Sequence, residues 1–352
     1  MRVIDIHVDT PYQVLVARGV LMQAGEQLAR VVRPCRAAVI TDDTVQALYA
    51  DTLVKSLESA GFSPCVFAFP HGEENKNLNT YAQILNFLCE NHLTRSDIIV
   101  SLGGGVVGDT AGFAAATYLR GVRCAHIPTT LLAMVDSSVG GKTAVDLPAG
   151  KNLCGAFWQP SLVLCDPDVL QTLPAQTLCD GLAECIKHGV LRDEALFDMI
   201  ASGAHAAQME EMIARNIEIK ADFVMRDEHD NGVRQMLNLG HTLGHAVEAC
   251  SDFSVTHGQG VAVGMVYAAR IAEKMGVCEK GLAQRMQSCL VANSLPVRAP
   301  YSASQLARVA LGDKKRRGGF ITLVLPERVG ACMLKKVPVE ELESIFAMGV
   351  EE

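Results

Sequence analysis

The chain has 352 residues, of which 49% are hydrophobic and 20% are charged, and its formal net charge is −8. This length suits two domains better than one core, and the composition is typical of a globular protein. The acidic balance argues against a nucleic-acid partner, because phosphate backbones are bound by a net basic face. It is compatible with a small anionic substrate, since a pocket can be basic inside an acidic shell.

The N-terminus and the cysteines favour a cytoplasmic protein with no membrane partner. Residues 1–13 alternate apolar and polar side chains and lack the apolar core of a signal peptide. No run approaches the roughly 18 apolar residues of a membrane-spanning helix. The 12 cysteines include no C-x-x-C pair and mostly lie in apolar runs, which predicts reduced, core-filling thiols.

Strand-like and helix-like segments alternate through the first half of the chain. A strand that ends near residue 102 runs directly into a glycine-rich loop and a further helix. Such alternation predicts a parallel sheet covered by helices on both faces, which is a Rossmann-like α/β fold. The expected strands are 3–8, 12–17, 37–41, 65–69, 97–102 and 122–127, and the expected helices include 44–60 and 78–92.

Helical periodicity dominates from about residue 175 onward. We therefore predict an NAD-binding α/β domain at 1–175 and a mainly α-helical domain at 176–352, which would bind metal and substrate. The active site is expected in the cleft between the domains, where ligand sites commonly form. The expected elements of this half are helices at 175–192, 194–203, 208–225, 235–250 and 257–275, a strand pair near 319–335 and a short final helix.

The string SLGGGVVGDTAGF follows a predicted buried strand and opens a predicted helix. Its Gly103, Gly105 and Gly108 fit the pattern G-x-G-x-x-G, which lets a backbone approach a phosphate beside a helix N-terminus. The motif lies in the third strand unit, and no acidic residue follows about 20 positions later. A tight strand-to-helix turn without a ligand therefore stays an alternative. Asp42 and Asp43, which end an earlier buried strand, could instead hold a ribose.

Histidines and a glutamate form a candidate metal-binding set. His241 and His245 are four residues apart and share one helix face, His257 opens the next helix, and Glu184 lies in a separate helix. A carboxylate and imidazoles from different helices suit a divalent metal with positions open for substrate oxygen. The spacing does not determine which three residues bind, and histidines that cap helices or pair with carboxylates are an equal alternative. Cys185 is expected to point into the core.

Basic residues beside glycines and polar turns form a third feature. Lys142 in GGKTAV and Lys151 in AGKNL occupy loop-like positions, where a phosphate or carboxylate would be met. Each cation alone is more often a solvated surface charge, but together with the glycine loop and the metal set they indicate a polyanionic substrate. DKKRRGG alone is weak support for a nucleic-acid patch. The cations are Arg120, Lys142, Lys151, Lys187, Lys220, Arg234 and Lys314.

Taken together, these motifs resemble the 3-dehydroquinate synthase family of the sugar phosphate cyclase superfamily. The matching strings occur in the family's order over roughly residues 40–330, and VDSSVGGKT joined to LNLGHTxGHA is the most specific combination. The main strings are GEENK (72–76), SLGGGVVGDTAGFAA (101–115), HIPTTLLAMVDSSVGGKTAVD (126–146), LPAQTLCDGLAECIKHG (173–189) and RQMLNLGHTLGHAVEA (234–249).

The resemblance implies the roles of individual positions. It implies metal ligands at Glu184, His241 and His257, so that His245 becomes an active-site residue and not a ligand. It implies substrate contacts at Arg120, Asp136, Lys142, Asn152, Lys187, Lys220, Arg234 and Asn238 and at one of Lys314 and Lys315. It implies cofactor contacts at Asp42, Glu73, Glu74, Asn75, Lys76, Gly104, Gly105, Val106, Val107, Gly108, Asp109, Thr129, Thr130, Lys142, Lys151, Val169, Leu170, Gln171 and Thr172.

The resemblance also implies a reaction. A lyase of this family converts 3-deoxy-D-arabino-heptulosonate 7-phosphate into 3-dehydroquinate and phosphate, the second step of the shikimate route to the aromatic amino acids. It uses catalytic NAD and one divalent metal, zinc or cobalt, for a transient oxidation, phosphate elimination, re-reduction and aldol closure. The family suggests a homodimer.

Four places depart from the family's usual residues. Gln176-Thr177 replaces the usual Arg-Glu, and aspartate, histidine and glutamine at 146, 188 and 259 replace the usual asparagine, tyrosine and glutamate. We expect these changes to alter hydrogen bonds around Glu184 and His257 without abolishing activity.

Three rival interpretations differ in what they require of the sequence. An inosose- or valiolone-type cyclase would keep the NAD and metal sites but change the substrate cations. A metal-dependent polyol dehydrogenase would release NADH stoichiometrically. A binding or scaffold protein on a retired cyclase fold should have lost part of the Glu/His/His set or the lysines, and all of them are present.

Overall fold

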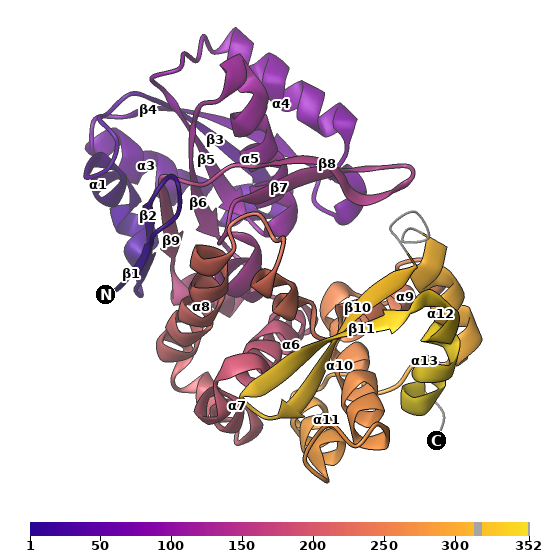
Figure 1. The fold of residues 1–352 in the computed structure, drawn as a ribbon. Coiled ribbons are helices and arrows are strands. Elements are labelled where there is room, and N and C mark those ends of the chain that lie inside the picture. Colours follow the sequence, from indigo (N-terminus) through magenta and orange to yellow (C-terminus); the bar gives the residue numbers. More distant parts are fainter. Residues whose placement is uncertain (313–318, 351–352) are drawn as a thin grey trace. The chain divides into compact units, whose positions relative to one another are not determined.

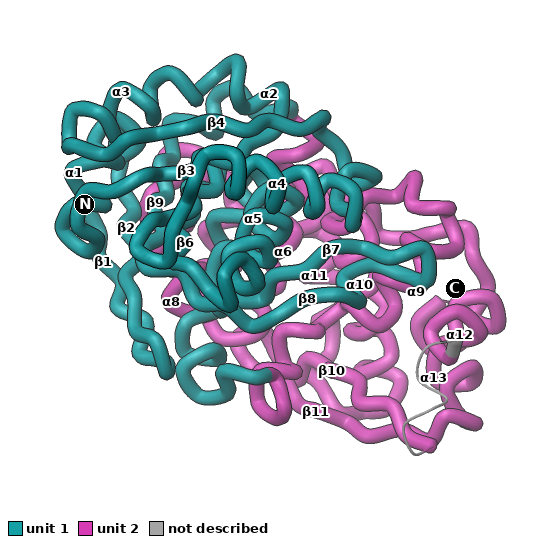
Figure 2. Tube along the Cα trace, turned by 90° about the horizontal axis from the view of Figure 1, so that it is seen from above, with its two compact units in different colours: residues 1–174, 220–229 teal, residues 175–219, 230–352 magenta. Residues whose placement is uncertain are grey.

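The structure, a computed structural model, describes residues 1–312 and 319–350, so Lys314 and Lys315 lie outside the described residues (Figure 1). The chain forms two compact units (Figure 2). Unit 1 comprises Met1–Pro174 and Lys220–His229, and unit 2 comprises Ala175–Ile219 and Asp230–Glu352. Helix α8 (Met209–Arg226) contributes residues to both units.

Unit 1 is built around a seven-stranded sheet with the strand order β1-β2-β9-β6-β5-β3-β4. Only the β1–β2 pair is antiparallel, and the other neighbouring strands run parallel. The predicted parallel α/β fold is therefore confirmed. The strands are β1 (Arg2–Ile6), β2 (Tyr12–Val16), β3 (Arg36–Asp42), β4 (Ser63–Phe69), β5 (Ile98–Gly103), β6 (Arg123–Pro128) and β9 (Leu162–Cys165).

Helices α4 and α5 cover one face of this sheet. Ile84 of α4 and Ala111 of α5 pack in one buried cluster with Ile40 of β3 and Ile99 of β5. Every residue of β5 is buried, as expected for a central parallel strand. The helices are α1 (Ala24–Ala29), α2 (Asp43–Val45), α3 (Asp51–Ser59), α4 (Leu78–Glu90) and α5 (Gly105–Thr117), with short turns η1 (Val20–Gln23), η2 (Gln46–Ala50), η3 (Glu73–Asn75), η4 (Tyr118–Arg120), η5 (Ala133–Ser137) and η6 (Pro167–Thr172).

A β-hairpin stands where the sequence suggested loops. Strand β7 (Lys142–Leu147) pairs with β8 (Gly150–Phe157), so the interpretation of Lys142 and Lys151 as loop residues is wrong. Glycines flank these strands, including Gly141 with φ 69° and Gly150 with φ 155°. Because glycines are typical of loops, the two short strands resembled loops in the sequence. Strand β9 was also not predicted.

Unit 2 is mainly helical, as predicted, and its described residues include one strand pair. The predicted single helix at 235–250 is wrong, because Gly240, with φ 77°, separates η8 (Val233–Asn238) from α9 (His241–Cys250). Strands β10 (Phe320–Arg328) and β11 (Ala331–Pro338) pair antiparallel, and β10 packs against α10 (Figure 1). The remaining elements are α6 (Ala175–Arg192), α7 (Glu194–Ala201), η7 (Ala204–Ala206), α10 (His257–Lys274), α11 (Leu282–Ala292), α12 (Ala303–Gly312), η9 (Val339–Glu341) and α13 (Leu342–Val350).

Glycines bring α9 and α10 into main-chain contact. A Cβ atom on Gly264 would lie 2.0 Å from the carbonyl oxygen of Gly240, and one on Gly244 would lie 2.8 Å from the carbonyl group of Gly260. No side chain fits in either place. The spacing of the two helices is therefore set by their backbones.

The 12 cysteines are all free thiols. Four of them, including Cys185, are buried, seven are half-buried, and Cys89 is exposed, so fewer fill the core than the apolar runs suggested. None of the helices in the described part of the chain is long and apolar enough to cross a membrane.

A buried histidine in the sheet predicts a loss of stability in mild acid. His126 of β6 is 5% exposed, its Nδ1 atom lies 2.7 Å from Ser101 Oγ, and burial lowers the pKa of His126 to about 4. Between this value and the ordinary 6.5 the unfolded chain binds the proton more tightly, so the free energy of unfolding falls as the pH falls through that window.

We expect His126→Asn to flatten the pH dependence of the unfolding free energy by up to about 1.4 kcal/mol per pH unit between about pH 6 and 4.5. Urea denaturation at several pH values measures both slopes. His7→Asn, which removes an exposed histidine of the same unit, is the control. Equal slopes for the His126 variant and the unaltered protein would contradict the prediction.

Candidate active site

The predicted cofactor positions of unit 1 follow the carboxyl ends of parallel strands. Because β3, β4, β5, β6 and β9 run parallel, the segments after them meet at one edge of the sheet. Strand β3 lies between β4 and β5, so the strand order reverses there, and ligands of open α/β sheets bind at such a point. The segments concerned are Asp42, 73–76, 104–109, 129–130 and 169–172.

The glycine-rich loop is a tight turn from β5 into α5. Gly104 is the residue before the first turn of α5, and a Cβ atom there would lie 3.0 Å from Thr130 Cγ2. A Cβ atom on Gly105 would lie 3.2 Å from Ser137 Oγ. The turn therefore brings main-chain N–H groups to the carboxyl edge of the sheet, where a helix N-terminus favours an anion.

Lys76, which is itself buried, joins half-buried Asp109 to exposed Asn152. It is 4% exposed, and its Nζ atom donates to Asp109 Oδ2 at 2.6 Å and to Asn152 Oδ1 at 2.5 Å. Burial raises the pKa of Asp109, although the Lys76 ammonium opposes this. The Asn152 N–H in turn donates to Asp146 Oδ1 at 2.7 Å, which holds Asn152 in a left-handed conformation with φ 57°. Asp146, a departure from the family, thus fixes the main chain of β8 at Asn152.

Other predicted residues of unit 1 also meet in pairs. Lys220 Nζ donates to Asp136 Oδ1 at 2.6 Å, and Lys151 Nζ lies 3.7 Å from Glu73 Oε1. Tyr49 belongs to no motif of the sequence analysis. Its hydroxyl lies 2.6 Å from Thr172 Oγ1 and donates to the Val169 carbonyl at 3.0 Å.

Among the predicted residues of unit 1, Asp42 caps a helix and Arg120 has a left-handed backbone conformation. Asp42 caps α2 by accepting the Val45 N–H at 2.8 Å, and burial raises the pKa of Asp42. Arg120 is exposed and has φ 68°, between Leu119 at 51° and Gly121 at 119°. Two successive non-glycine residues in the left-handed region carry strain, and such strain is concentrated at functional sites.

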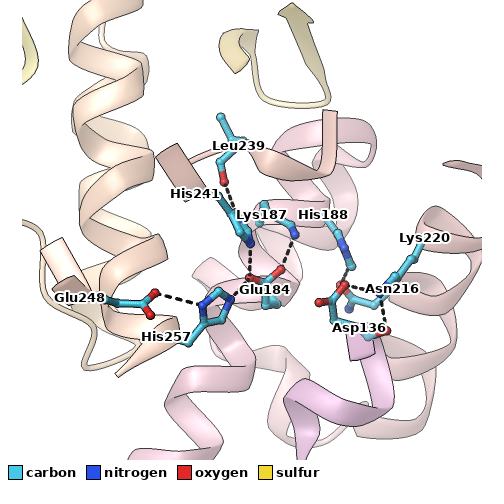
Figure 3. A network of polar contacts seen from close by, with 10 residues as sticks. All are labelled: Asp136, Glu184, Lys187, His188, Asn216, Lys220, Leu239, His241, Glu248 and His257. Atoms are coloured by element: carbon cyan, nitrogen blue, oxygen red, sulfur yellow. Dashed lines mark hydrogen bonds and ion pairs between the residues drawn. The ribbon is translucent and has the colours of Figure 1, made fainter. Parts of the chain in front are cut away.

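The proposed metal ligands of unit 2 come together around Glu184. Its carboxylate is fully buried, and Oε1 lies 3.5 Å from His241 Nε2 and 3.3 Å from His257 Nε2. Lys187 forms an ion pair with Oε2 from the next turn of α6. Figure 3 shows Lys187, His241 and His257 all pointing at this carboxylate. Three residues from three helices, α6, α9 and α10, therefore converge as the sequence suggested.

The Nδ1 atom of each imidazole already faces a hydrogen-bond acceptor. His241 Nδ1 lies 3.1 Å from the Leu239 carbonyl oxygen, and His257 Nδ1 lies 3.1 Å from Glu248 Oε1 (Figure 3). With Nδ1 held by an acceptor, Nε2 of each ring is the nitrogen left to face Glu184.

This arrangement fits a divalent metal. One carboxylate oxygen and two imidazole nitrogens lie within 4.8 Å of one another, a donor set that suits zinc or cobalt. Lys187 pairs with Oε2 of Glu184, and both imidazole Nε2 atoms face Oε1 of the same carboxylate. A buried carboxylate oxygen that faces two imidazole nitrogens is a site where a divalent cation would be bound.

The charges of these groups are strongly coupled. Burial alone would raise the pKa of Glu184, but the Lys187 ammonium and the two imidazoles hold that pKa well below its ordinary value. Burial and the Lys187 charge lower the pKa of His241 well below its ordinary value. Burial also opposes protonation of His257, but Glu184 and Glu248 together raise its pKa to about 10. The carboxylate is thus ionised and His241 is neutral, the forms in which both residues bind metals.

The other predicted residues of unit 2 lie near these ligands along the chain. His245 is exposed one turn after His241, and their ring centroids are 5.3 Å apart. Arg234 is 2% exposed and Asn238 is exposed, both in η8. His188, a departure from the family, is buried; its Nδ1 atom lies 3.1 Å from Asn216 Oδ1, and a ring nitrogen lies within 4.8 Å of a Glu184 carboxylate oxygen.

Glu248 is a member of the cluster that the sequence interpretation missed. It is buried and holds His257 Nδ1, and it lies seven residues after His241, hence on the same face of α9. That periodicity was the available sign. His245 and Glu248 also have ligand atoms within 4.8 Å of His257, but Glu248 occupies the Nδ1 side of the ring.

Sequence comparisons connect the chain with one family over most of its length. Residues 66–180 match the model of the 3-dehydroquinate synthase N-terminal region, and residues 181–316 match that of its C-terminal region. A 3-dehydroquinate synthase from Streptococcus sanguinis is 44% identical over 343 residues, covering 96% of this chain and 97% of the relative. One from Streptococcus pneumoniae is 42% identical over 340 residues, covering 95% of this chain and 96% of the relative.

Solved structures share the fold. A 2-deoxy-scyllo-inosose synthase complexed with carbaglucose-6-phosphate, NAD⁺ and Co²⁺ has a TM-score of 0.87 at 24% identity and covers 99% of this chain and 100% of its own. A 2-epi-5-epi-valiolone synthase from Streptomyces hygroscopicus, with NAD⁺ and Zn²⁺ bound, has a TM-score of 0.86 at 26% identity and 97% coverage of both chains. An NADH-dependent butanol dehydrogenase from Thermotoga maritima has a TM-score of 0.67 at 14% identity, with 98% of both chains covered.

Proposed function

Because this chain belongs to the 3-dehydroquinate synthase family, we propose that it converts 3-deoxy-D-arabino-heptulosonate 7-phosphate into 3-dehydroquinate and phosphate. The resemblance drawn from the motifs is confirmed by two family matches and by relatives that span nearly the whole chain. The observation that carries the proposal within the structure is the convergence of Glu184, His241 and His257.

We assign the metal and the dinucleotide to different units. Glu184, His241 and His257 of unit 2 would hold one divalent ion, zinc or cobalt, and the carboxyl edge of the sheet in unit 1 would hold NAD. Related cyclases of this fold were solved with NAD⁺ and either Co²⁺ or Zn²⁺, which supports the assignment. When bound, these groups supply a hydride acceptor and a Lewis acid, so that a substrate hydroxyl can be oxidised transiently and then restored.

The chain's own residues prepare the metal site. Lys187 keeps Glu184 ionised, and the Leu239 carbonyl and Glu248 fix the rings of His241 and His257. His245, exposed beside His241, is placed to accept, donate or orient a proton of the substrate.

The basic residues of the proposed site would bind the charged groups of an anionic substrate. In our proposal Arg120, Asn152 and Lys187 bind the phosphate, and Lys142, Lys220 and Arg234 bind the carboxylate and hydroxyl groups, with Asn238 as a further polar contact. Asp136 holds the Lys220 ammonium at 2.6 Å and so fixes where that charge points. The Lys76–Asp109 pair and the Glu73–Lys151 pair belong to the proposed dinucleotide site.

A turnover assay with metal removal tests the proposed function. Purified protein receives the heptulosonate 7-phosphate and NAD at a small fraction of the substrate concentration, with phosphate release and NADH absorbance followed together. We expect many phosphates per NAD and no net NADH. A chelator should reduce the rate at least about 100-fold, and added zinc or cobalt should restore it, because the Lewis acid is lost and regained.

The same assay separates the alternatives. Stoichiometric accumulation of NADH would identify a dehydrogenase and contradict the cyclisation. Phosphate release only from sugar phosphates that lack the carboxylate would instead indicate an inosose- or valiolone-type cyclase, since solved structures of both types share this fold.

We further propose that the enzyme acts as a cytoplasmic homodimer. The free state of its 12 cysteines is compatible with a reducing compartment. The dimer is an inference from the family resemblance.

A further inference from the structure

Two of the departures from the family converge on one carboxylate. Asp180 of α6 accepts a hydrogen bond from Thr256 Oγ1 at 2.5 Å. Burial raises the pKa of Asp180, and the Gln259 main chain and the Gln176 side chain lie close enough to the same carboxylate to act against this shift. Gln176 and Gln259 are far apart in sequence, but the fold brings them to the same partner. The role of this cluster is not explained by the metal ligands or the substrate cations.

Thr256 and Gln259 form the cap at the start of α10. Thr256 is the residue before the helix, and its N–H donates to Gln259 Oε1 at 3.1 Å as one half of a reciprocal capping box. The first residue of the helix is His257. The cap therefore fixes the main chain on both sides of a proposed metal ligand.

The same end of α10 lies directly on α6. A Cβ atom on Gly258 would lie 2.4 Å from the Cα atom of Asp180, so only glycine permits this approach. Asp180 precedes Glu184 by four residues and therefore lies on the same face of α6, one turn away. One carboxylate thus links the helix that carries Glu184 to the first turn that carries His257.

We propose that Asp180, acting through Thr256 and Gln259, is a positioning residue that fixes His257 relative to Glu184 before the metal binds. The inference rests on the proposed function, since it requires that these ligands take a metal. Glu248 orients the imidazole ring, whereas Asp180 fixes the backbone from which the ring extends. The His257 side chain is 33% exposed at a helix end, where an unanchored backbone would lose conformational freedom on binding the ion.

The test is a titration of the metal-free protein with Zn²⁺, and with Co²⁺ to record the visible absorption of the bound ion. Asp180→Ala and Thr256→Val should each weaken zinc binding about 10- to 100-fold, the usual cost of losing a group that orients a ligand. Thr256→Ser keeps the hydroxyl and should restore the affinity. The double variant should bind no more weakly than either single variant, because both changes remove one shared bond.

Unit 2 contains a matched control. Ser302 and Gln305 form a capping box of the same chemistry at α12, where the Ser302 N–H donates to Gln305 Oε1 at 2.9 Å and the Gln305 N–H donates to Ser302 Oγ at 3.2 Å. Gln259→Ala should weaken zinc binding and shift the Co²⁺ spectrum. Gln305→Ala removes an equivalent cap and should leave both unchanged. Thermal unfolding of each metal-free variant establishes that it is folded, and Thr256→Val preserves the side-chain volume if Asp180→Ala does not fold.

The outcomes distinguish this inference from the proposed function. If the unaltered protein binds zinc and the Asp180 and Thr256 variants bind it equally well, the positioning role is wrong while the metal site stands. Equal losses in the Gln259 and Gln305 variants would also overturn it, since the effect would then be general stability. If the unaltered protein binds neither ion, both proposals fail.

Discussion

Replacing Glu184 with glutamine is expected to lower turnover at least about 1,000-fold and to weaken zinc binding at least about 100-fold, more than the loss of any group that only orients a ligand. Glu184 is the anionic member of the proposed ligand set, and the neutral amide cannot supply that charge. Zinc titration and phosphate release measure the two effects. A variant that binds zinc as tightly as the unaltered protein would contradict the assignment.

The same substitution should also destabilise unit 2. Lys187 is 1% exposed, so Glu184→Gln leaves its ammonium buried without the paired carboxylate, at a cost of about 3–5 kcal/mol in unfolding free energy. Adding Lys187→Met should recover most of that stability but none of the zinc binding. The double variant thereby separates loss of the metal site from loss of the fold, which denaturant unfolding and zinc titration report independently.

Adding one methyl group at Gly264 is expected to cost about 3 kcal/mol of unfolding free energy, at the upper end of the range for overpacking. The new Cβ atom would lie 2.0 Å from the Gly240 carbonyl oxygen, and backbone cannot move aside as a side chain could. Because Gly240 immediately precedes His241, we also expect Gly264→Ala to weaken zinc binding.

Gly108→Ala is the comparison for stability. It adds the same methyl group to a helix, but no atom lies within 4 Å of the new Cβ. This variant should gain about 0.5–1 kcal/mol, because alanine is the better helix former. Denaturant unfolding of both variants provides the measurement. Similar stabilities for the two would show that the contact between α9 and α10 has room to relax.

Long amphipathic segments were predictable because their pattern is local. Helix α6 occupies the predicted residues 175–192, and the parallel strands β3, β4, β5 and β6 lie within a few residues of their predicted positions. The β7–β8 hairpin was missed because its strands are short and flanked by glycines that also permit loops. The break between η8 and α9 was missed because it depends on Gly240 with φ 77°, which periodicity cannot reveal.

The sequence indicated the proposed metal ligands better than it indicated the residues that hold those ligands in place. Spacing placed His241 and His245 on one helix face, but it could not identify which helices pack together, and the partner of His241 proved to lie on α10. Asp180 and Tyr49 act through contacts across the fold, and no local pattern marks them. Glu248 had only its helical spacing from His241 to mark it. Such contacts become visible only when the packing is known.

The backbone contact between α9 and α10 also restricts how this protein can diverge in evolution. Gly240, Gly244, Gly260 and Gly264 each have main-chain atoms of the other helix within 3 Å of where a side chain would begin. Every replacement of a glycine codon adds at least one carbon there, so descendants inherit the spacing of the two helices unchanged. A lineage that adapts to another ion or substrate must therefore do so through the residues around the ligands, while the framework that spaces those ligands stays constant.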